Sequence, residues 1–447
     1  MASGSTVGLS CSVVFTTHTQ YPLPSQKFMI PTSWKRFHLS QLINKALSLT
    51  KPIPFDFLVK GDLLRTSLGD WCAENDFSEE ETLEIEYIES IMPPQKMSDI
   101  PHEDWVSSVS CKLAGYFLTA SYDGYIRGFD YSQKLTFSAL AHAAPITSLC
   151  VIPTHGHEDE LSYTIATSSH DLTAQITRLS LSSESEPKSE TQTLAKLHLH
   201  TAPVSSIAAD PSGNHLLTSS WDTLIGLWDT TVPLTDEVPE APINDREKKK
   251  RRKLNGGTND SAEKAKRKAP TMVLKSHTAR VSRVVFGNSG SENTAYSCGF
   301  DSTVRVWDVE SGVCTHTITS SEKPFLDIAL NADGHTALAA STDRTVTLYD
   351  VRQGSFSTSG TTSSGSLLHA AMPSCLATGS TPHQVFSGAY DGVVRLWDLR
   401  SLKSAVTSFK AWEGRKKVLS IDWMRGMVGV GGEGGLEVWK AIEDLHS

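Results

Sequence analysis

An eight-residue pattern recurs along most of this 447-residue chain. It starts with an acidic residue and carries an aromatic residue just before its last position. Five clear copies and two degenerate ones are Asp123–Asp130, Asp222–Asp229, Asp301–Asp308, Asp343–Asp350, Asp391–Asp398, Asp171–Arg178 and Glu433–Lys440. Once the segment 231–270 is set aside, the copies recur about every 43 residues, the period of a four-stranded repeat unit. This repetition constrains the fold more than any local motif does.

Each copy predicts a β-hairpin, because a run ending in Ser, Thr or Gly precedes the acidic residue and an alternating strand follows it. An aspartate suits the tight turn, since its side chain can bond the nearby backbone. The turn aspartates of the clear copies are Asp123, Asp222, Asp301, Asp343 and Asp391. The aromatic residues, expected to pack between neighbouring sheets, are Phe129, Trp228, Trp307, Tyr349, Trp397 and Trp439.

Histidines also recur, each four residues before a predicted strand: His102, His142, His200 and His277. Equivalent positions in different repeats lie far apart, so these histidines do not predict a shared metal site. We expect each to bond a Ser or Thr and the turn aspartate of its own repeat, which stabilises the hairpin by about 1 kcal/mol per bond.

Seven repeats of this period resemble the WD40 family. The resemblance implies an all-β, seven-bladed WD40 β-propeller over residues 102–447, and ring closure leaves only short sheet edges. The strand that closes the ring must come from residues 85–100 or from 441–447, and the sequence leaves both open. The segment 231–270 starts with prolines and then turns basic, which predicts a disordered basic insertion in the propeller.

Residues 10–90 do not match the repeat. Two β-rich segments, an amphipathic helix with apolar residues from Leu39 to Leu47, a hairpin, a short helix and a last strand follow one another. That order is typical of a small α+β ubiquitin-like (β-grasp) domain. A linker is expected at 91–101.

Composition narrows the function classes. The net charge is -9, and the seven cysteines include no CxxC pair. This pattern indicates a reducing compartment and neither a disulfide framework nor a structural zinc site. No apolar run approaches the ~20 residues of a membrane helix, and we expect an intracellular, soluble protein.

Several short sequence segments add a more specific resemblance. They are Pro52–Leu58, Leu63–Leu68, Ile85–Tyr87, Pro93-Pro94 and Glu103–Ser108. They look like the eukaryotic ribosome-biogenesis WD-repeat proteins that carry an N-terminal ubiquitin-like (NLE-type) domain. The Notchless family shares that domain but has an eight-bladed propeller, so seven repeats favour the first family.

The resemblance implies a non-enzymatic scaffold for large ribosomal subunit biogenesis and pre-rRNA processing. It implies a nucleolar complex with a BOP-type WD-repeat protein and a pescadillo-type protein on the pre-60S particle. It further implies removal by the AAA ATPase midasin, which grips the ubiquitin-like domain.

One acidic segment, Ser78-Glu79-Glu80-Glu81, precedes the last strand of the small domain. By itself it predicts a solvated acidic loop. The resemblance implies instead that Glu80, with Glu79 and Glu81 as alternatives, completes the Mg²⁺ site of a MIDAS domain on midasin, since a hard ion accepts a carboxylate oxygen. The chain itself is expected to hold no cofactor, no metal and no catalytic residue.

A second charged segment carries two basic clusters, which predict nuclear localisation, to the nucleolus and nucleoplasm. Non-specific RNA contact or plain solvation are the alternatives. The residues are Lys248, Lys249, Lys250, Arg251, Arg252, Lys253, Lys264, Lys266, Arg267 and Lys268.

Gly429–Gly434 matches a dinucleotide-binding pattern, but a strand rather than a helix is expected to follow, so we interpret it as a hairpin turn. A WD-repeat substrate receptor in ubiquitin signalling is the alternative to the scaffold. Co-purification with cullin or proteasome subunits would distinguish that receptor from the scaffold.

Overall fold

The structure is a computed structural model. It describes residues 9–49, 51–77, 81–90, 92–153, 162–180, 190–239, 265–288, 293–319, 322–352, 365–379 and 381–441. The chain divides into two compact units. One comprises Met1–Pro93 with Trp397–Val406, and the other comprises Pro94–Leu396 with Thr407–Ser447. No helix in the described ranges is long and apolar enough to cross a membrane.

The first unit contains one mixed sheet and two helices in the predicted order. The elements are β1 (Ser10–Thr16), β2 (Lys27–Pro31), α1 (Arg36–Ala46), β3 (Phe55–Val59), β4 (Asp62–Leu63), α2 (Leu68–Glu74) and β5 (Thr82–Glu89). The sheet order is β2-β1-β5-β3-β4, and β1 pairs in parallel with β5 at its centre. Two strands from opposite ends of the unit therefore form the middle of its sheet.

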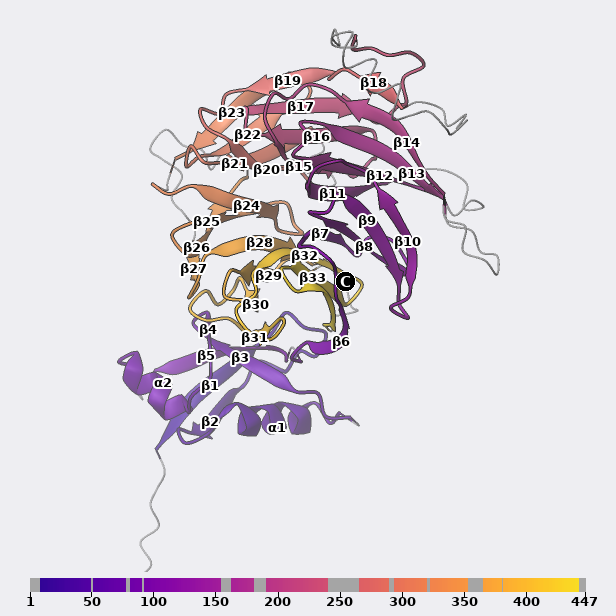
Figure 1. Ribbon diagram of the computed structural model, residues 1–447. Coiled ribbons are helices and arrows are strands. Elements are labelled where there is room, and N and C mark those ends of the chain that lie inside the picture. The colour runs from indigo at the N-terminus through magenta and orange to yellow at the C-terminus, as the bar shows by residue number, and fades with distance from the viewer. Residues whose placement is uncertain are drawn as a thin grey trace, which may run out of the picture. The chain divides into compact units, whose positions relative to one another are not determined.

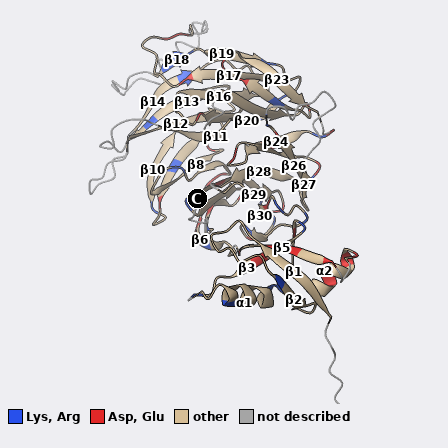
Figure 2. Cartoon of the chain, turned by 180° about the vertical axis from the view of Figure 1, so that it is seen from behind, with Lys and Arg blue, Asp and Glu red and all other residues tan. Residues whose placement is uncertain are grey.

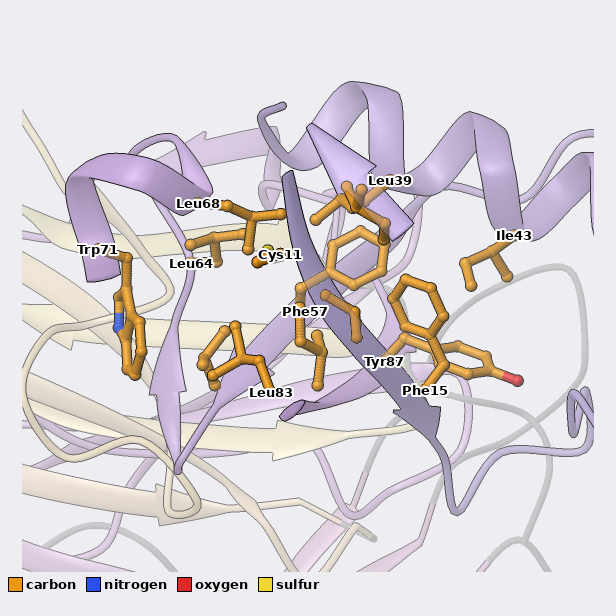
Figure 3. Packing of buried hydrophobic residues seen from close by; sticks show 14 of the residues in the cluster. Cys11, Phe15, Leu39, Ile43, Phe57, Leu64, Leu68, Trp71, Leu83 and Tyr87 are labelled. Carbon is orange, nitrogen blue, oxygen red and sulfur yellow. The ribbon is translucent and has the colours of Figure 1, made fainter. Parts of the chain in front are cut away.

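One hydrophobic core holds this unit together (Figure 3). Leu39 and Ile43 lie one turn apart on α1 and are fully buried against the sheet. Phe57 of β3 and Tyr87 of β5 are also fully buried. Burial of such side chains contributes about 1.5–3 kcal/mol each, so the sheet and α1 fold as one body.

The second unit consists, in its described part, of seven further sheets (Figure 1). The first three contain β7 (Val106–Ser110), β8 (Tyr116–Ser121), β9 (Tyr125–Asp130), β10 (Leu135–Leu140); β11 (Ile146–Ile152), β12 (Ser162–Ser169), β13 (Ala174–Ser180), β14 (Glu190–Leu197), β18 (Lys266–Lys268); and β15 (Val204–Ala209), β16 (His215–Ser220), β17 (Leu224–Asp229), β19 (Met272–Lys275).

The other four sheets contain β20 (Val281–Phe286), β21 (Thr294–Gly299), β22 (Val304–Asp308), β23 (Val313–Ile318); β24 (Phe325–Leu330), β25 (Thr336–Ser341), β26 (Thr345–Asp350), β27 (Gly365–Leu368); β28 (Pro373–Thr378), β29 (Gln384–Ala389), β30 (Val393–Asp398), β31 (Thr407–Lys410); and β32 (Val418–Met424), β33 (Met427–Gly432), β34 (Gly435–Lys440), β6 (Gln95–Ile100).

The first strands of these sheets face one another around a common centre. β7 contacts β11, β11 contacts β15, and the series continues through β20, β24, β28 and β32 back to β7. Side chains join neighbouring strands: Ser205 Oγ donates to the carbonyl of Val281 at 2.6 Å, and Ser282 Oγ donates to that of Phe325 at 2.7 Å. The sheets thus form a closed ring, consistent with a β-propeller.

The ring closes through the N-terminal side of the chain. Strand β6 pairs antiparallel with β34 and completes the sheet of β32, β33 and β34, which we call the closing sheet. Of the two sequence alternatives, the one at 85–100 is therefore correct. The expected linker 91–101 is wrong over residues 95–100, because these residues form β6, which pairs with the edge of β34.

The expected disorder of 231–270 is also wrong at its end. Residues 266–268 form β18, which adds in parallel to β14 at the edge of another sheet. Asp236 and Glu237 bind this segment, accepting from the backbone N–H groups of Arg267 at 2.8 Å and Ala269 at 2.9 Å. An unpaired strand edge and two acidic side chains thus order a stretch whose composition alone predicted disorder.

Candidate functional site

The acidic loop of the first unit lies between α2 and β5. Residues 78–80, including Glu79 and Glu80, fall outside the described residues. Glu81 is described and is exposed to solvent, directly before β5. The predicted contact residue, Glu80, directly precedes Glu81 in the sequence, and the structure tests only this last of the three candidates for exposure.

The two ends of the loop are anchored in the core. Leu68 and Trp71 of α2 are buried, and the rings of Trp71 and Phe77 lie 6.3 Å apart. The ammonium group of Lys60 lies 4.7 Å from the centre of the Phe77 ring. On the other side, Leu83 of β5 is buried. The described residues on both sides of the loop are therefore packed in the core of the unit.

Acidic residues gather on α2 and at the start of β5 (Figure 2). Asp70 is used locally: it caps α2 together with Ser67, whose hydroxyl donates to its carboxylate at 2.6 Å. The hydrogen bonds from Ser67 hold the pKa of Asp70 below its usual value. Glu81 and Glu84 are exposed, so their carboxylates are accessible to a partner's cation. The chemistry offered here is oxygen ligation of a hard ion.

The basic clusters are only partly described. Lys248 to Lys253 and Lys264 lie outside the described residues. Lys266 and Arg267 are half-buried in β18, and Lys268 is buried, with its ammonium group against the Asp229 carboxylate and the carbonyl of Thr231. Lys268 therefore serves the fold, and its assignment to a localisation signal is wrong, because a receptor cannot reach a buried ammonium group.

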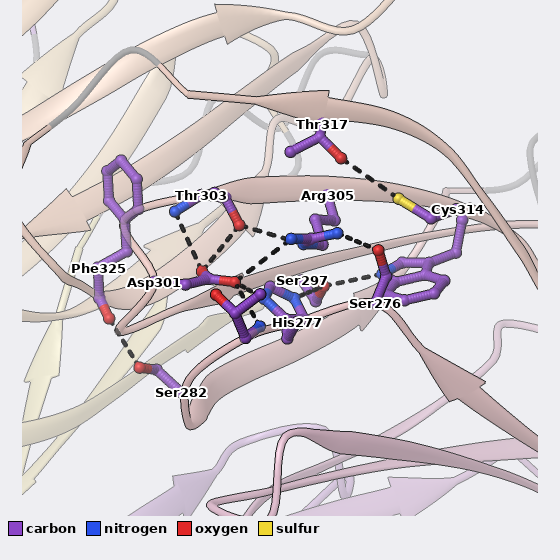
Figure 4. Close-up of polar contacts among 12 residues, drawn as sticks. Ser276, His277, Ser282, Ser297, Asp301, Thr303, Arg305, Cys314, Thr317 and Phe325 are labelled. Carbon is purple, nitrogen blue, oxygen red and sulfur yellow. Dashed lines mark hydrogen bonds and ion pairs between the residues drawn. The ribbon is translucent and has the colours of Figure 1, made fainter.

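His277 occupies a satisfied network inside its own sheet, as predicted (Figure 4). His277 Nδ1 donates to Asp301 at 2.8 Å, and Ser297 Oγ lies 2.7 Å from Nε2. Trp307 Nε1 donates to the same hydroxyl at 2.8 Å. Because a carboxylate only accepts, the proton sits on Nδ1 and the serine hydroxyl donates to Nε2.

Two other sheets repeat this arrangement. His200 bonds Asp222 at 3.0 Å and Thr218 at 2.9 Å, and Trp228 donates to the same Thr218 hydroxyl. His142 contacts Asp171 at 2.8 Å and Thr167 at 3.0 Å. These histidines hold their hairpins together and are not available as metal ligands.

The electrostatics of the turns follow from these contacts. Burial raises the pKa of Asp301, but the hydrogen bonds that its carboxylate accepts from His277, Thr303 and Thr278 outweigh it, so this pKa lies well below its usual range. The pKa of Asp222 is lowered in the same way against its own burial, by His200. Asp343, in contrast, accepts hydrogen bonds from the backbone and hydroxyl of Thr345 in an exposed turn.

Two sheets depart from the predicted pairing. His102 bonds Thr119 at 3.0 Å, but its Nδ1 donates to the carbonyl of Ile100, and Asp123 pairs instead with Arg127 at 2.6 Å. The predicted His102–turn aspartate bond is therefore wrong. In this sheet the Arg127 guanidinium holds the carboxylate, whereas Arg305, at the same spacing from Asp301, stays 3.5 Å away and leaves the closer contact to His277.

His369 was missed by the sequence reasoning. It is buried, its Nε2 lies 2.7 Å from Ser387 Oγ, and Asp391 of the same sheet pairs with Arg395 at 2.7 Å. Desolvation lowers the pKa of His369 to about 4. The sequence does contain the spacing that marks the other histidines, because His369 also stands four residues before a strand. That strand, however, starts with Pro373 instead of a β-branched residue.

The closing sheet anchors its tryptophan differently. Trp439 Nε1 donates to Glu437 at 2.9 Å, and the backbone N–H of Trp412 donates to the same carboxylate at 3.1 Å. Glu437 is fully buried and pairs with Lys96 of β6 at 2.5 Å. The hairpin turn predicted at Gly429–Gly434 is shorter than expected, because Gly429 to Gly432 belong to β33; a strand, β34, and not a helix follows the turn, as predicted. Trp397 is buried, also as predicted.

Two family models match the chain. The NLE (NUC135) domain matches residues 11–72, and the WD domain, G-beta repeat, matches residues 191–229, 268–308, 312–350 and 361–398. The chain is thus a WD-repeat protein with an N-terminal NLE domain.

Three relatives, each described as Ribosome biogenesis protein YTM1, refine this class. The one from Laccaria bicolor is 62% identical over 98% of this chain and 96% of its own length. The one from Coprinopsis cinerea is 59% identical over 96% and 94%, and the one from Saccharomyces cerevisiae is 33% identical over 84% and 83%. The chain belongs to the Ribosome biogenesis protein YTM1 family, which confirms the resemblance stated above.

Proposed function

We propose that the protein is a non-enzymatic scaffold for large ribosomal subunit biogenesis and pre-rRNA processing, acting in the nucleolus and nucleoplasm. It comprises a seven-bladed WD40 propeller and a ubiquitin-like domain. The propeller joins a BOP-type WD-repeat protein and a pescadillo-type protein on the pre-60S particle. The observation that carries this proposal is the 62% identity, over 98% of the chain, to a ribosome biogenesis protein.

The ubiquitin-like domain is the handle by which midasin removes the protein. Glu80 completes the Mg²⁺ site of the midasin MIDAS domain. The support is its place in an acidic loop beside the exposed Glu81, between two elements anchored in one core. A carboxylate–metal contact is directional and reversible, and a load on the loop passes into the core of the domain.

The test compares Glu80→Ala with Glu84→Ala in the full chain. Glu84 is exposed on β5, so both variants lose one acidic group near the same loop. Binding to a purified MIDAS domain in Mg²⁺ should weaken at least about tenfold for Glu80→Ala, as for a lost charge contact, and stay unchanged for Glu84→Ala. Chelation of Mg²⁺ should abolish binding of the unaltered chain.

The measurement in cells follows the release of the protein from pre-60S particles. The Glu80→Ala protein should enter pre-60S particles normally and accumulate on them, whereas the Glu84→Ala protein should leave. Release of the Glu80→Ala protein at the normal rate rejects the handle role. Recovery of cullin or proteasome subunits in place of pre-60S proteins would reject the scaffold in favour of a ubiquitin-signalling receptor.

A further inference from the structure

A short stretch of chain joins the acidic loop of the first unit to the strand that closes the ring. Glu81, at the end of the loop, directly precedes β5, and β5 ends at Glu89. Residues 90–94 separate that end from Gln95, where β6 begins. A pull on the acidic loop therefore reaches β6 along one strand and one short linker.

Strand β5 is firmly held along this path. It lies between β1 and β3 in the middle of its sheet. Its side chains Leu83, Ile85 and Tyr87 are at most 1% exposed and belong to the core of the first unit. Because these three side chains would have to enter water together, β5 stays in place and passes the load to its far end.

The linker takes up little extension. A polypeptide extends by at most about 3.6 Å per residue, so residues 90–94 extend to about 20 Å and then pass the load on. Pro93 and Pro94 restrict the linker further, because the proline ring fixes one backbone angle of each residue.

The first unit has a second connection, the segment Trp397–Val406. Its contacts with the β3–β4 region are non-covalent. Lys403, whose side chain is 72% exposed, pairs with Asp62, and the backbone N–H of Leu63 donates to Ser401 Oγ at 3.2 Å. Exposed ion pairs and single hydrogen bonds contribute little stability, so under load these contacts part and the covalent path through β6 carries the pull.

Strand β6 is weakly anchored by comparison. Within β6, all of whose residues the structure describes, only Ser98 and Ile100 are buried. Lys96 pairs with Glu437, but its side chain is 41% exposed, and Met97 is 51% exposed. β6 is also the last strand of its sheet and pairs only with β34. On a path where the two strands bear the same load in series, β6 therefore detaches before β5 does.

Departure of β6 would undo the closure of the ring. Ile100 packs in a hydrophobic cluster that joins the first and last sheets, with Val106 of β7, Phe129 of β9, and Leu436 and Val438 of β34. Without β6 this cluster loses a member, and the edge of β34 is left unpaired. The two sheets that meet where the ring closes are then held together less tightly.

We propose that β6 is a releasable clasp: a pull on the acidic loop detaches β6 from β34 and opens the ring at its closing sheet. The opened ring no longer holds its binding surfaces rigidly, and the protein then leaves the pre-60S particle. Elements that move in function are drawn from the least stable parts of a fold, as β6 is here. This inference rests on the proposed release by midasin and names the part of the ring that responds.

Single-molecule pulling on the full chain tests the order of events. Load is applied through azide-bearing amino acids at Glu81 and Glu310, two exposed positions, so midasin is not needed. We expect a first extension step of about 20–40 Å, the length gained when the chain between the linker and β7 leaves the ring. A first step more than about ten times longer, in which several sheets unravel together, would overturn the clasp.

A cross-link locks the clasp. Gln95 and Lys440 face each other in the pairing of β6 with β34, and both are exposed. Oxidation of the Gln95→Cys/Lys440→Cys variant by oxygen and copper phenanthroline joins the two thiols in a disulfide, which mass spectrometry verifies. The short first step should be lost in the oxidised chain and return with dithiothreitol. Persistence of that step in the cross-linked chain would show that it arises elsewhere.

A matched cross-link lies off the load path. Leu224 and Lys275 face each other where β19, the outer strand of another sheet, pairs with β17. The oxidised Leu224→Cys/Lys275→Cys chain should keep the short first step. Its loss there as well would mean that any cross-link stiffens the ring, which contradicts a clasp at β6.

Two substitutions within β6 measure its anchoring. Ile100→Ala removes a buried side chain, so at a fixed load β6 should detach at least about tenfold faster. Met97→Ala alters an exposed position on the same strand and should leave the rate unchanged. Equal rates for the two variants would contradict the assigned anchor.

Release from purified pre-60S particles by midasin and ATP tests the role of the clasp. The oxidised Gln95→Cys/Lys440→Cys chain should bind a MIDAS domain normally but stay on the particles, whereas the oxidised Leu224→Cys/Lys275→Cys chain should leave. Release of both at the same rate overturns the clasp and leaves the handle standing. If the unaltered chain does not bind the MIDAS domain, the proposed handle falls, and the role of the clasp in release falls with it.

Discussion

The sheet of β20–β23 and the closing sheet solve the same problem with different chemistry. In the first, Trp307 is held by Ser297, His277 and Asp301, all within one stretch of the chain. In the second, Trp439 is held by Glu437, whose charge is balanced by Lys96 on the neighbouring strand β6, 341 residues earlier in the sequence. A sheet made from consecutive strands can use a local network. The sheet that joins the two ends of the ring instead contains a long-range ion pair.

The largest expected effect follows from removing the buried charge of the closing sheet. Glu437→Ala leaves the N–H groups of Trp412 and Trp439 without their acceptor and separates β34 from Lys96. A buried donor left without its acceptor costs about 1–3 kcal/mol, so the two orphaned N–H groups should lower the unfolding free energy by about 4 kcal/mol; the lost contact to Lys96, which is 41% exposed, adds little. Urea unfolding of the full chain, followed by circular dichroism, measures it. Glu310→Ala, at an exposed position, is the control, and equal stability of the two variants would show that the pair does not hold the ring closed.

The local networks should be less costly to break. Asp301→Ala removes the acceptor for His277, Thr278 and Thr303, and we expect a loss of about 3 kcal/mol. Asp343→Ala, in an exposed turn without a histidine partner, should cost about 1 kcal/mol.

The contribution of Asp301 to stability should also depend on pH. Since the folded-state pKa of Asp301 is depressed, this contribution is full above about pH 4 and is lost as the pH falls through that pKa. The same unfolding assay over a pH series tests both points, and equal losses for the two variants would contradict them.

A smaller, pH-dependent effect is expected from His369. Burial lowers its folded-state pKa to about 4, whereas the unfolded histidine titrates near 6.5. The unfolded state therefore takes up the proton first, and stability falls by roughly 2 kcal/mol between pH 7 and pH 4.5.

Substitution isolates this contribution. His369→Gln should flatten the dependence of the unfolding free energy on pH in this window, whereas His335→Gln, at an exposed position, should leave it unchanged. An identical slope for the unaltered chain and the His369→Gln variant would mean that another group titrates.

Most of the repeated architecture could be predicted, because it depends on residues a fixed distance apart. The turn aspartates, the strand-end tryptophans and the histidines each obey such a spacing, and His277, Ser297 and Asp301 meet as expected. The loop residue Glu80 could be located in the sequence but falls outside the described residues.

The features that escaped prediction depend on contacts between distant segments. Nothing near Glu437 in the sequence indicates Lys96, and nothing near Lys268 indicates the edge of β14. By composition, a cluster of lysines predicts side chains exposed to solvent. Lys268 is nevertheless buried, because its ammonium group forms an ion pair with Asp229 and a hydrogen bond to the carbonyl of Thr231. Such pairs become apparent only when the sheets are assembled.

The pairing of β6 with β34 has a consequence for synthesis. β6 leaves the ribosome before any other strand of the ring, and β34 leaves after all of them. Each sheet from β7 onward can form as it emerges, but the first-made strand must wait for nearly the whole polypeptide before its partner exists. Long-range pairings of this kind form slowly and leave strand edges exposed to aggregation in the interval. A factor that binds β6 on the nascent chain would therefore protect this edge until β34 has been made.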